Sequence, residues 1–420
     1  MRIFILFFIF TKTTYAADPF IEQLIKSIGN DPDSFEIESQ KEYRKKLKLS
    51  AQTKLFLPTL SASTSKVKAK STFNTNESEY QTTSLTLEYS LFNFGSDYLR
   101  YKSQKSSLNA FHSTSKVTKI KSEYTIAKLL LTKIKLLSDK KIQEEVISLK
   151  ERSFAISRQR FKRGNLSKND LLIIKINLSN SRSQLASLRQ QIHQTDAQLT
   201  ALNTQSELKS FPWISLFKKK GIKNTTLLNF DEAKNPELLN YKYLAQSHTN
   251  LAISEKRKHL GRFDISYSRD LYQQDETDDL YGHSTALTYT LPLFENFNQD
   301  KLIQQSKAKA TTAEYIYDYQ KRKIQADVKH KKATLQSAFQ DFQERLTTLN
   351  DANFLFSNVL KRFKKGVLNV NDLILEQDRL LATKKITTNS IFNLHLSYIE
   401  FIHVNGLLLT ENAHFFNNKT

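Results

Sequence analysis

A segment of twelve residues occurs twice in this chain, and this repetition limits the possible folds more than any other feature of the sequence. Residues 160–171 read RFKRGNLSKNDL, and residues 362–373, which lie 202 positions later, read RFKKGVLNVNDL. The same offset relates residues 85–92 to residues 287–294. Because chance matches rarely keep one spacing, we expect the chain to contain two copies of one structural unit.

The repetition predicts two similar halves behind a targeting segment. Arg2, the apolar run 3–10 and the small residue Ala16 have the order of a secretory signal peptide. The predicted divisions are a signal peptide over 1–16, a first repeat over 17–205, a linker over 206–234, a second repeat over 235–410 and a tail over 411–420. Within the repeats, we expect β-hairpins over about 58–93 and 261–294, and helical hairpins over about 96–205 and 297–410 with tips at 164 and 366.

Long segments of the chain contain no residue that breaks a helix. Residues 97–162 and 297–364 lack both Gly and Pro, and a helix of about 65 residues spans roughly 100 Å. The returning helix after Gly164 carries a heptad seam, which is typical of helix-on-helix packing. Its members are Leu171, Ile174, Leu178, Ser181, Leu185, Leu188, Ile192, Thr195, Leu199 and Leu202.

Each predicted β-hairpin has one apolar face. Leu85, Leu87, Tyr89 and Leu91 alternate with polar residues, and residues 287–293 follow a similar pattern, which indicates strands. The entering strand over 60–70 has the weakest pattern because three lysines interrupt it. Four strands cannot close a sheet in lipid without leaving open edges. A membrane-spanning wall would therefore need copies of the chain arranged with closed symmetry.

The two repeated glycines mark the predicted tips of the helical hairpins. Gly164 and Gly366 can adopt the left-handed conformation that ends a helix at low cost. Ser167 and Asn169, with Asn369 and Asn371 in the second copy, can cap the returning helices. Asp170 and Asp372 follow in the first turn, where the helix dipole favours a carboxylate. These two acids have either this capping role alone or a further role at the tip.

Composition excludes several classes of function. The chain has no Cys, and its nine His show no metal-ligand spacing. Nucleotide-binding glycine fingerprints and the G-x-S-x-G motif of hydrolases are absent. We therefore predict that the protein is not an enzyme, with no catalytic residue, no cofactor and no metal.

The chain is strongly basic, with 63 Lys and Arg against 42 Asp and Glu and a formal net charge of +21. Residues 98–163 alone hold 17 basic and 5 acidic residues. Most of these side chains are expected on solvated helix faces, and a tunnel lining that favours anions is the alternative. A basic coiled-coil protein that binds nucleic acid is a rival function, but it leaves the signal peptide and the strands unexplained. A periplasmic adaptor is a second rival, although adaptors carry one helical hairpin rather than two.

The order and duplication of these motifs resemble the outer membrane efflux protein family, which includes the TolC-like channels. The resemblance rests on the duplicated F-x-x-G-x-x-x-x-x-D pattern, on Asn235-Pro236-Glu237-Leu238 at the start of the second copy, and on the strand ends at 90–95 and 291–294. It covers residues from about 30 to 410. The fold that it implies is mainly α with a small β part: a homotrimer whose twelve-stranded β-barrel in the outer membrane continues into a twelve-helix α-barrel across the periplasm.

The resemblance also implies a function and a set of tip residues. The protein would be the passive exit duct of a tripartite efflux or type I secretion system, located in the outer membrane, in contact with its lipid and extending into the periplasm. Its partners would be a periplasmic adaptor (membrane fusion) protein and an inner-membrane pump, with no role for nucleic acid. The residues implied in gating and adaptor docking are Phe161, Gly164, Asn169, Asp170, Phe363, Gly366, Asn371 and Asp372.

Two positions depart from the TolC-like pattern. Leu368 stands where an Arg helps to lock the closed tip, and Leu375 stands where a second acid faces the lumen. The closing contacts of this protein are therefore expected to differ. The sequence does not separate drug efflux from protein secretion.

Overall fold

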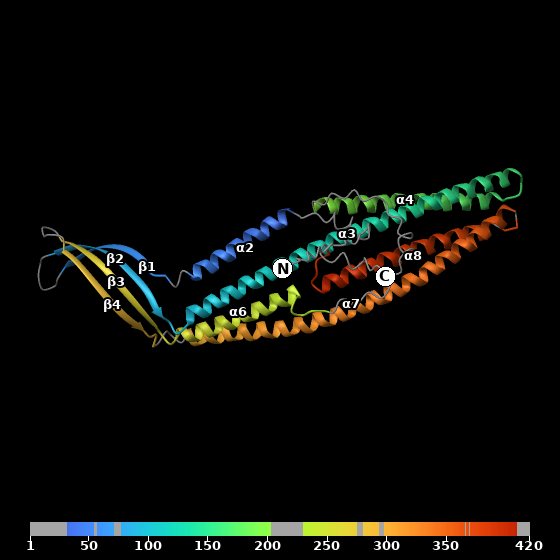
Figure 1. The fold of residues 1–420 in the computed structure, drawn as a ribbon. Helices are drawn as coiled ribbons and strands as arrows, with labels where there is room; N and C mark the ends of the chain where they lie inside the picture. Colours follow the sequence, from blue (N-terminus) through green and yellow to red (C-terminus); the bar gives the residue numbers. More distant parts are fainter. Residues whose placement is uncertain are drawn as a thin grey trace, which may run out of the picture. The chain divides into compact units, whose positions relative to one another are not determined.

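The computed structural model describes residues 32–53, 57–70, 77–202, 230–274, 280–293, 298–365, 367–368 and 370–409. Gly366, the signal peptide, the tail and most of the linker predicted from the sequence lie outside these residues. The described helices are α2 (Pro32–Thr53), α3 (Ser96–Lys162), α4 (Lys168–Ala201), α6 (Pro236–Lys258), α7 (Asn298–Lys364) and α8 (Val370–Val404) (Figure 1). The strands are β1 (Thr59–Lys70), β2 (Glu77–Phe92), β3 (Arg262–Gln274) and β4 (Leu280–Thr290). The predicted fold class, mainly α with a small antiparallel sheet, is confirmed.

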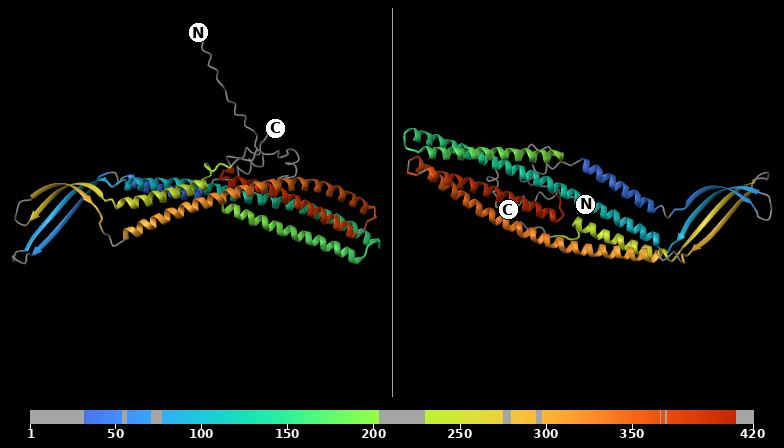
Figure 2. Two further views of the ribbon diagram at one scale, coloured as in Figure 1. Left: turned by 90° about the horizontal axis from the view of Figure 1, so that it is seen from below. Right: turned by 180° about the vertical axis from the view of Figure 1, so that it is seen from behind.

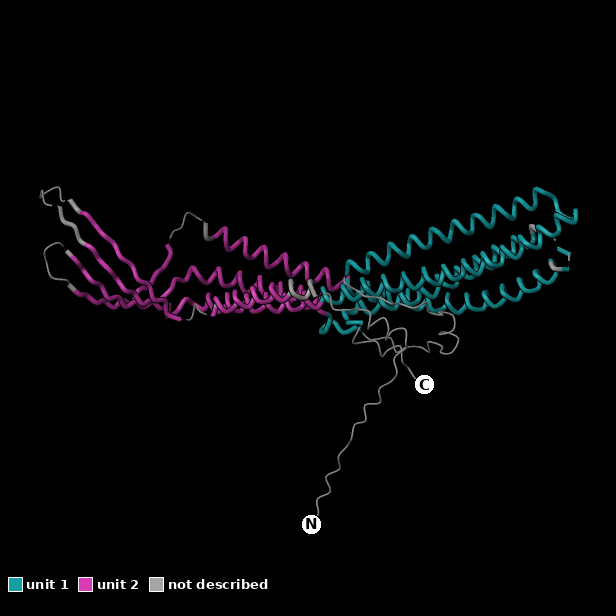
Figure 3. Tube along the Cα trace, turned by 90° about the horizontal axis from the view of Figure 1, so that it is seen from above, with its two compact units in different colours: residues 1–33, 117–235, 324–420 teal, residues 34–116, 236–323 magenta. Residues whose placement is uncertain are grey.

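The compact units of the structure do not coincide with the sequence repeats. Figure 3 shows a helical unit of residues 1–33, 117–235 and 324–420, and a strand-bearing unit of residues 34–116 and 236–323. Each unit thus takes residues from both copies of the repeat. The long helices α3 and α7, with 67 residues each, contribute to both units.

The strand-bearing unit contains one antiparallel sheet in the order β1-β2-β3-β4, and Figure 2 shows its strands side by side. Within the described strands, β1 and β4 each pair with one neighbour. Both outer edges of the sheet are therefore open in a single chain. Strand β1, whose sequence pattern is the weakest of the four, is nevertheless present. Each of its residues from Thr59 to Lys70 pairs with a residue of β2.

The register places most of the large apolar side chains of the sheet on one face, together with the charged residues Lys66, Lys68 and Arg269. Leu87 lies opposite both Leu60 and Tyr267, and Ile265 lies opposite Leu287. These side chains share one face because positions directly opposite each other point to the same side. The other face carries mainly hydroxyl side chains, including Ser84, Thr86, Ser266, Ser268 and Ser284. The apolar face is exposed in the single chain, where Leu287 is 69% accessible.

Small polar residues join the helices of the strand-bearing unit. Ser96 and Ser254 are buried, and their hydroxyl oxygens lie 3.0 Å apart. One heptad further along α3, the Ser103 and Ser247 hydroxyl oxygens are again 3.0 Å apart. Because serine is small and forms its own hydrogen bonds, α3 and α6 can pack closely without an unsatisfied polar group.

The heptad seam predicted from the sequence is the packing face of α4. Ile174, Leu178, Ser181, Thr195 and Leu199 are buried, and the remaining seam residues are partly buried. Figures 1 and 2 show α4 beside α3, and α8 beside α7, in the helical unit. Gln143 of α3 donates a hydrogen bond to the Ser181 carbonyl at 2.9 Å. The α3–α4 hairpin is therefore a helix pair held by a narrow seam with polar members.

Candidate gate at the helical-hairpin tips

The first tip is a tight turn between α3 and α4. Gly164 has a φ of +75°, and the amide of Asn165 donates to the Arg160 carbonyl at 2.9 Å. A Cβ atom at Gly164 would meet nothing within 4 Å. Glycine is therefore required here by its left-handed backbone and not by lack of space.

Ser167 begins the returning helix with a reciprocal cap. Its hydroxyl oxygen accepts a hydrogen bond from the Asp170 amide at 3.0 Å, and the hydroxyl donates to Asp170 Oδ2 at 2.8 Å. The first bond is an N-cap, and the second holds the Asp170 carboxylate against the capping hydroxyl. Ser167 is the cap predicted from the sequence, whereas Asn169 is an exposed residue inside the helix. Asp170 has the expected first-turn position.

The second tip repeats part of this geometry. The Val367 amide donates to the Arg362 carbonyl at 3.1 Å, which is the equivalent, 202 residues later, of the bond from Asn165 to Arg160. Asn371 and Asp372 lie in the first turn of α8, and Leu375 is 60% exposed. Gly366 lies outside the described residues.

Phe161 and Phe363 occupy equivalent sequence positions but different environments. Phe161 is 39% exposed, whereas Phe363 is 2% exposed. Phe363 belongs to a core cluster with Ile174, Phe356, Leu373 and Leu380. The Arg160 guanidinium carbon lies 5.6 Å from the centre of the Phe363 ring, within the range of a cation–π contact. Phe363 therefore stabilises the packing of the two hairpins, and Phe161 alone of this pair presents its ring at the surface.

A row of polar contacts joins α3 to α8, further from the tips than most of the core cluster. The Lys150 ammonium lies 2.9 Å from Asp378 Oδ1, and the Lys384 ammonium lies 2.8 Å from Glu145 Oε2. Gln377 donates to the Ser153 hydroxyl oxygen at 2.9 Å. The Lys150 side chain is only 8% exposed while that of Asp378 is 50% exposed. The two hairpins are thus joined by contacts between residues more than 220 positions apart in the sequence.

Sequence reasoning did not select the residues of this row. Lys150 and Asp378 are two of many charged residues on long helices, and no local pattern marks them as partners. The structure brings them together because α8 packs beside α3 at the right axial level. The heptad pattern alone does not specify that level.

Buried titratable groups lie further along the same helices. Burial lowers the pKa of His395 in α8 to about 3. Burial also raises the pKa of Asp139 in α3, against the opposing effects of Lys135 and Lys385. The described residues include no group of three His, Asp or Glu that could hold a metal ion. None of the helices in the described ranges has the length and apolar character needed to cross a membrane.

Large apolar side chains are exposed on two helices of the helical unit, α4 and α7. In α4, Leu172, Ile173 and Ile176 are between 42% and 57% exposed. In α7, Phe354 is 71% and Leu355 is 42% exposed. Exposed groups of large apolar residues indicate contact surfaces.

Comparison with known proteins agrees with this architecture. Residues 46–203 match the sequence model of the family described as outer membrane efflux protein. The resemblance to this family is confirmed. The matched region of the efflux-protein model runs from α2 to the end of α4, so it contains the first β-hairpin and the whole first helical tip. No curated protein matches the chain.

Solved structures share the fold over nearly the whole chain. CusC has a TM-score of 0.81 at 13% identity, with 94% of each chain covered. VceC of Vibrio cholerae, an outer membrane protein, has a TM-score of 0.78 at 13% identity, covering 93% of this chain and 97% of its own. The outer membrane channel CmeC of Campylobacter jejuni has a TM-score of 0.78 at 13% identity, with 94% and 88% covered. At 13% identity, these matches show that the chain shares the fold of these proteins. Nothing in them supports the nucleic-acid or adaptor alternatives.

Proposed function

We propose that the protein is the passive outer-membrane exit duct of an efflux or type I secretion system, formed by three copies of the chain. The observation that carries this proposal is the four-stranded sheet with two open edges and an exposed apolar face. An open edge and an apolar face are both costly in water. Copies joined edge to edge in a lipid bilayer would satisfy both.

The helical unit supports the same assembly. Ile176 of α4 lies twelve residues after Gly164, and Phe354 of α7 lies twelve residues before Gly366. The two positions are therefore equally far from the tip residue in the sequence. The exposed apolar residues of α4 in one copy would meet those of α7 in the next copy, and this head-to-tail contact closes a ring. Three copies would supply twelve strands, four from each chain.

In this duct the tips would form the gate and the adaptor docking surface. Phe161, Asn169, Asp170 and Asp372 would face the adaptor or the narrowest part of the tunnel. Phe363 and the contacts between α3 and α8 would hold the α7–α8 hairpin against the α3–α4 hairpin in the closed state. The energy for transport would come from an inner-membrane pump.

The assembly can be tested on the purified full-length protein in detergent. We expect light scattering to give the mass of three copies and planar bilayers to show single-channel currents. A stable single subunit without channel activity would contradict the proposal.

The role of the tip acids has its own test. If Asp170 and Asp372 narrow the tunnel, replacing both with Ala should raise single-channel conductance. Asp351→Ala, at an exposed site on α7, is the matched control. An unchanged conductance in the double variant would leave both acids as helix caps only.

A further inference from the structure

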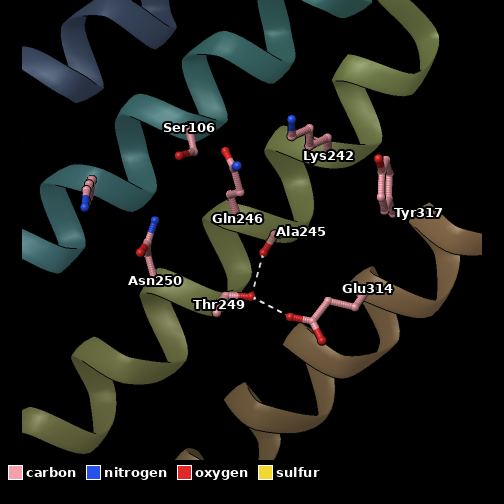
Figure 4. Close-up of a pocket in the computed structure, with 9 residues that line it drawn as sticks. Ser106, Lys242, Ala245, Gln246, Thr249, Asn250, Glu314 and Tyr317 are labelled. Atoms are coloured by element: carbon pink, nitrogen blue, oxygen red, sulfur yellow. Dashed lines mark hydrogen bonds between the residues drawn. The ribbon is translucent and has the colours of Figure 1, made fainter. Parts of the chain in front are cut away.

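The strand-bearing unit contains a polar groove that the proposed duct function does not use. Residues of α3, α6 and α7 line it, and its volume is about 540 Å³ (Figure 4). The groove exists because α6 contributes the small, buried residue Ala245 between its two neighbours. Its volume lies within the range of small-molecule sites in proteins.

Most of the lining can form hydrogen bonds. Gln246 and Asn250 of α6 contribute amides, and Ser106 of α3 contributes a hydroxyl. Figure 4 shows Tyr317 of α7 across the groove, beside Lys242. The ring of Tyr317 is partly exposed, so it offers a flat surface against which a ring could stack.

Two ammonium groups and one carboxylate give the groove a formal charge of +1. Lys102 comes from α3, Lys242 from α6 and Glu314 from α7. The Lys102 ammonium lies 5.7 Å from the centre of the Tyr98 ring. Among the described carboxylates, none forms an ion pair with Lys102 or Lys242. Both ammonium groups are therefore available to an anion.

Glu314 is already engaged on the far side of the groove. Its Oε1 lies 3.1 Å from the Thr249 hydroxyl oxygen, which is also 3.0 Å from the Ala245 carbonyl. Figure 4 shows both contacts. The carboxylate is held near α6, and its charge opposes the binding of an anion at the two lysines.

We propose that this groove binds a small anionic solute that carries a ring. The acid group of the solute lies at Lys242 and its ring lies against Tyr317, which Figure 4 shows beside that lysine. Lys102 adds a second positive charge to the lining, and the remaining polar groups of the solute bond Gln246 and Asn250. The two lysines are exposed to solvent, so each contributes a modest free energy to binding. The site is distinct from the gate and goes beyond the proposed duct function.

Fluorescein is a suitable probe because it combines a carboxylate, a ring system and fluorescence. We expect its anisotropy to rise when the full-length protein is added in detergent at low salt, where charge interactions are strongest. A rhodamine ester, which has the same xanthene rings but a positive charge, should bind more weakly. Equal binding of the two dyes, or no binding of fluorescein, would overturn the proposal.

Substitutions that remove a positive or a negative charge from the groove should change fluorescein binding in opposite directions. Lys102→Gln and Lys242→Gln should each weaken fluorescein binding about two- to fivefold, and Glu314→Gln should strengthen it by a similar factor. Lys105→Gln, also exposed on α3 but outside the groove, should have no effect. Binding that none of these substitutions changes would also overturn the proposal.

Bilayer recordings locate the groove without testing its existence. If fluorescein reduces the channel current and Lys242→Gln removes the effect, the groove faces the tunnel and receives cargo. Because the anisotropy measurement does not depend on channel activity, loss of binding is distinguishable from failure of the proposed function.

Discussion

At the scale of single residues, equivalent positions in the two repeats have diverged in environment. Phe161 and Phe363 are 202 residues apart and occur in the same local sequence, but the first is exposed and the second is in the core. The local backbone cannot cause this difference, since both tips share the equivalent amide-to-carbonyl bond. The difference arises because Phe363 meets residues from α4 and α8.

This asymmetry predicts unequal effects of truncation. Phe363→Ala should reduce the free energy of unfolding by about 3–5 kcal/mol, because it removes a fully buried ring and leaves a cavity. Phe161→Ala should cost less than about 1 kcal/mol. Thermal melting of the two variants in detergent gives the comparison. Equal losses of stability would contradict the burial of Phe363.

His395 predicts a pH-dependent stability. Its pKa is lowered by burial from 6.5 to about 3 in the folded protein, so the unfolded chain takes up a proton at a higher pH than the folded chain does. This contribution to stability is therefore present above pH 6.5 and decreases as the pH falls toward about 3. His395→Gln should flatten the decrease in melting temperature below pH 6.5, whereas the exposed control His193→Gln should not.

At the scale of helices, the contacts between α3 and α8 decide how the two hairpins meet. Ion pairs and a hydrogen bond form this row, and apolar residues form the cluster nearer the tips. Ile142 and Val146 of α3 also pack against Leu381 of α8 beside the row. When two helices separate, their polar groups can form hydrogen bonds with water in place of the bonds that they lose. Apolar side chains find no such replacement, so exposing them costs free energy. If the tips of the proposed duct open, the polar contacts of this row are the part of the α3–α8 interface that water would replace.

Unequal burial of Lys150 and Asp378 predicts unequal effects of breaking their ion pair. Asp378→Asn leaves the ammonium of Lys150 buried without its counter-charge, so it should lower stability by about 1–2 kcal/mol and raise conductance. The value is below that for a fully buried pair because Asp378 is half exposed. Lys150→Met should have a smaller effect, since the remaining carboxylate reaches water. Melting temperatures and single-channel currents would test this order.

At the scale of the whole molecule, the single chain leaves two kinds of contact surface exposed. Its sheet has open edges, and its helical unit exposes apolar residues on α4 and on α7. These surfaces lie on different helices, so copies of the chain can join head to tail. In the proposed trimer, closure of the ring would leave no open edge in the sheet.

The absence of Cys permits a direct test of this contact. The double variant Ile176→Cys with Phe354→Cys should give covalent trimers after oxidation or treatment with a short bismaleimide, because each contact joins α4 of one copy to α7 of the next. Ile176→Cys paired with Leu375→Cys, an exposed position on α8, is the matched control. Equal cross-linking in both pairs, or none in the first, would contradict the proposed contact.

Much of the architecture follows from local sequence. The segments without Gly or Pro, predicted over 97–162 and 297–364, are α3 and α7 to within one residue at each end. The seam of α4 and the Ser167 cap are where the heptad pattern and the tip motif place them. These features depend on residues within one or two helical turns, so a single sequence contains the necessary information.

The sequence by itself therefore determined the duplicated order of elements, the helix lengths, the apolar and polar faces of the strands and the turns at the tips. Tertiary structure alone decided that the repeats mix into two units, that Phe363 is buried while Phe161 is exposed, and that Lys150 meets Asp378 across 228 positions. The physical reason is the distance in sequence between the residues that interact. Backbone propensity and amphipathic periodicity are properties of neighbouring residues, whereas the pairing and axial level of packed helices depend on side chains that are distant in sequence.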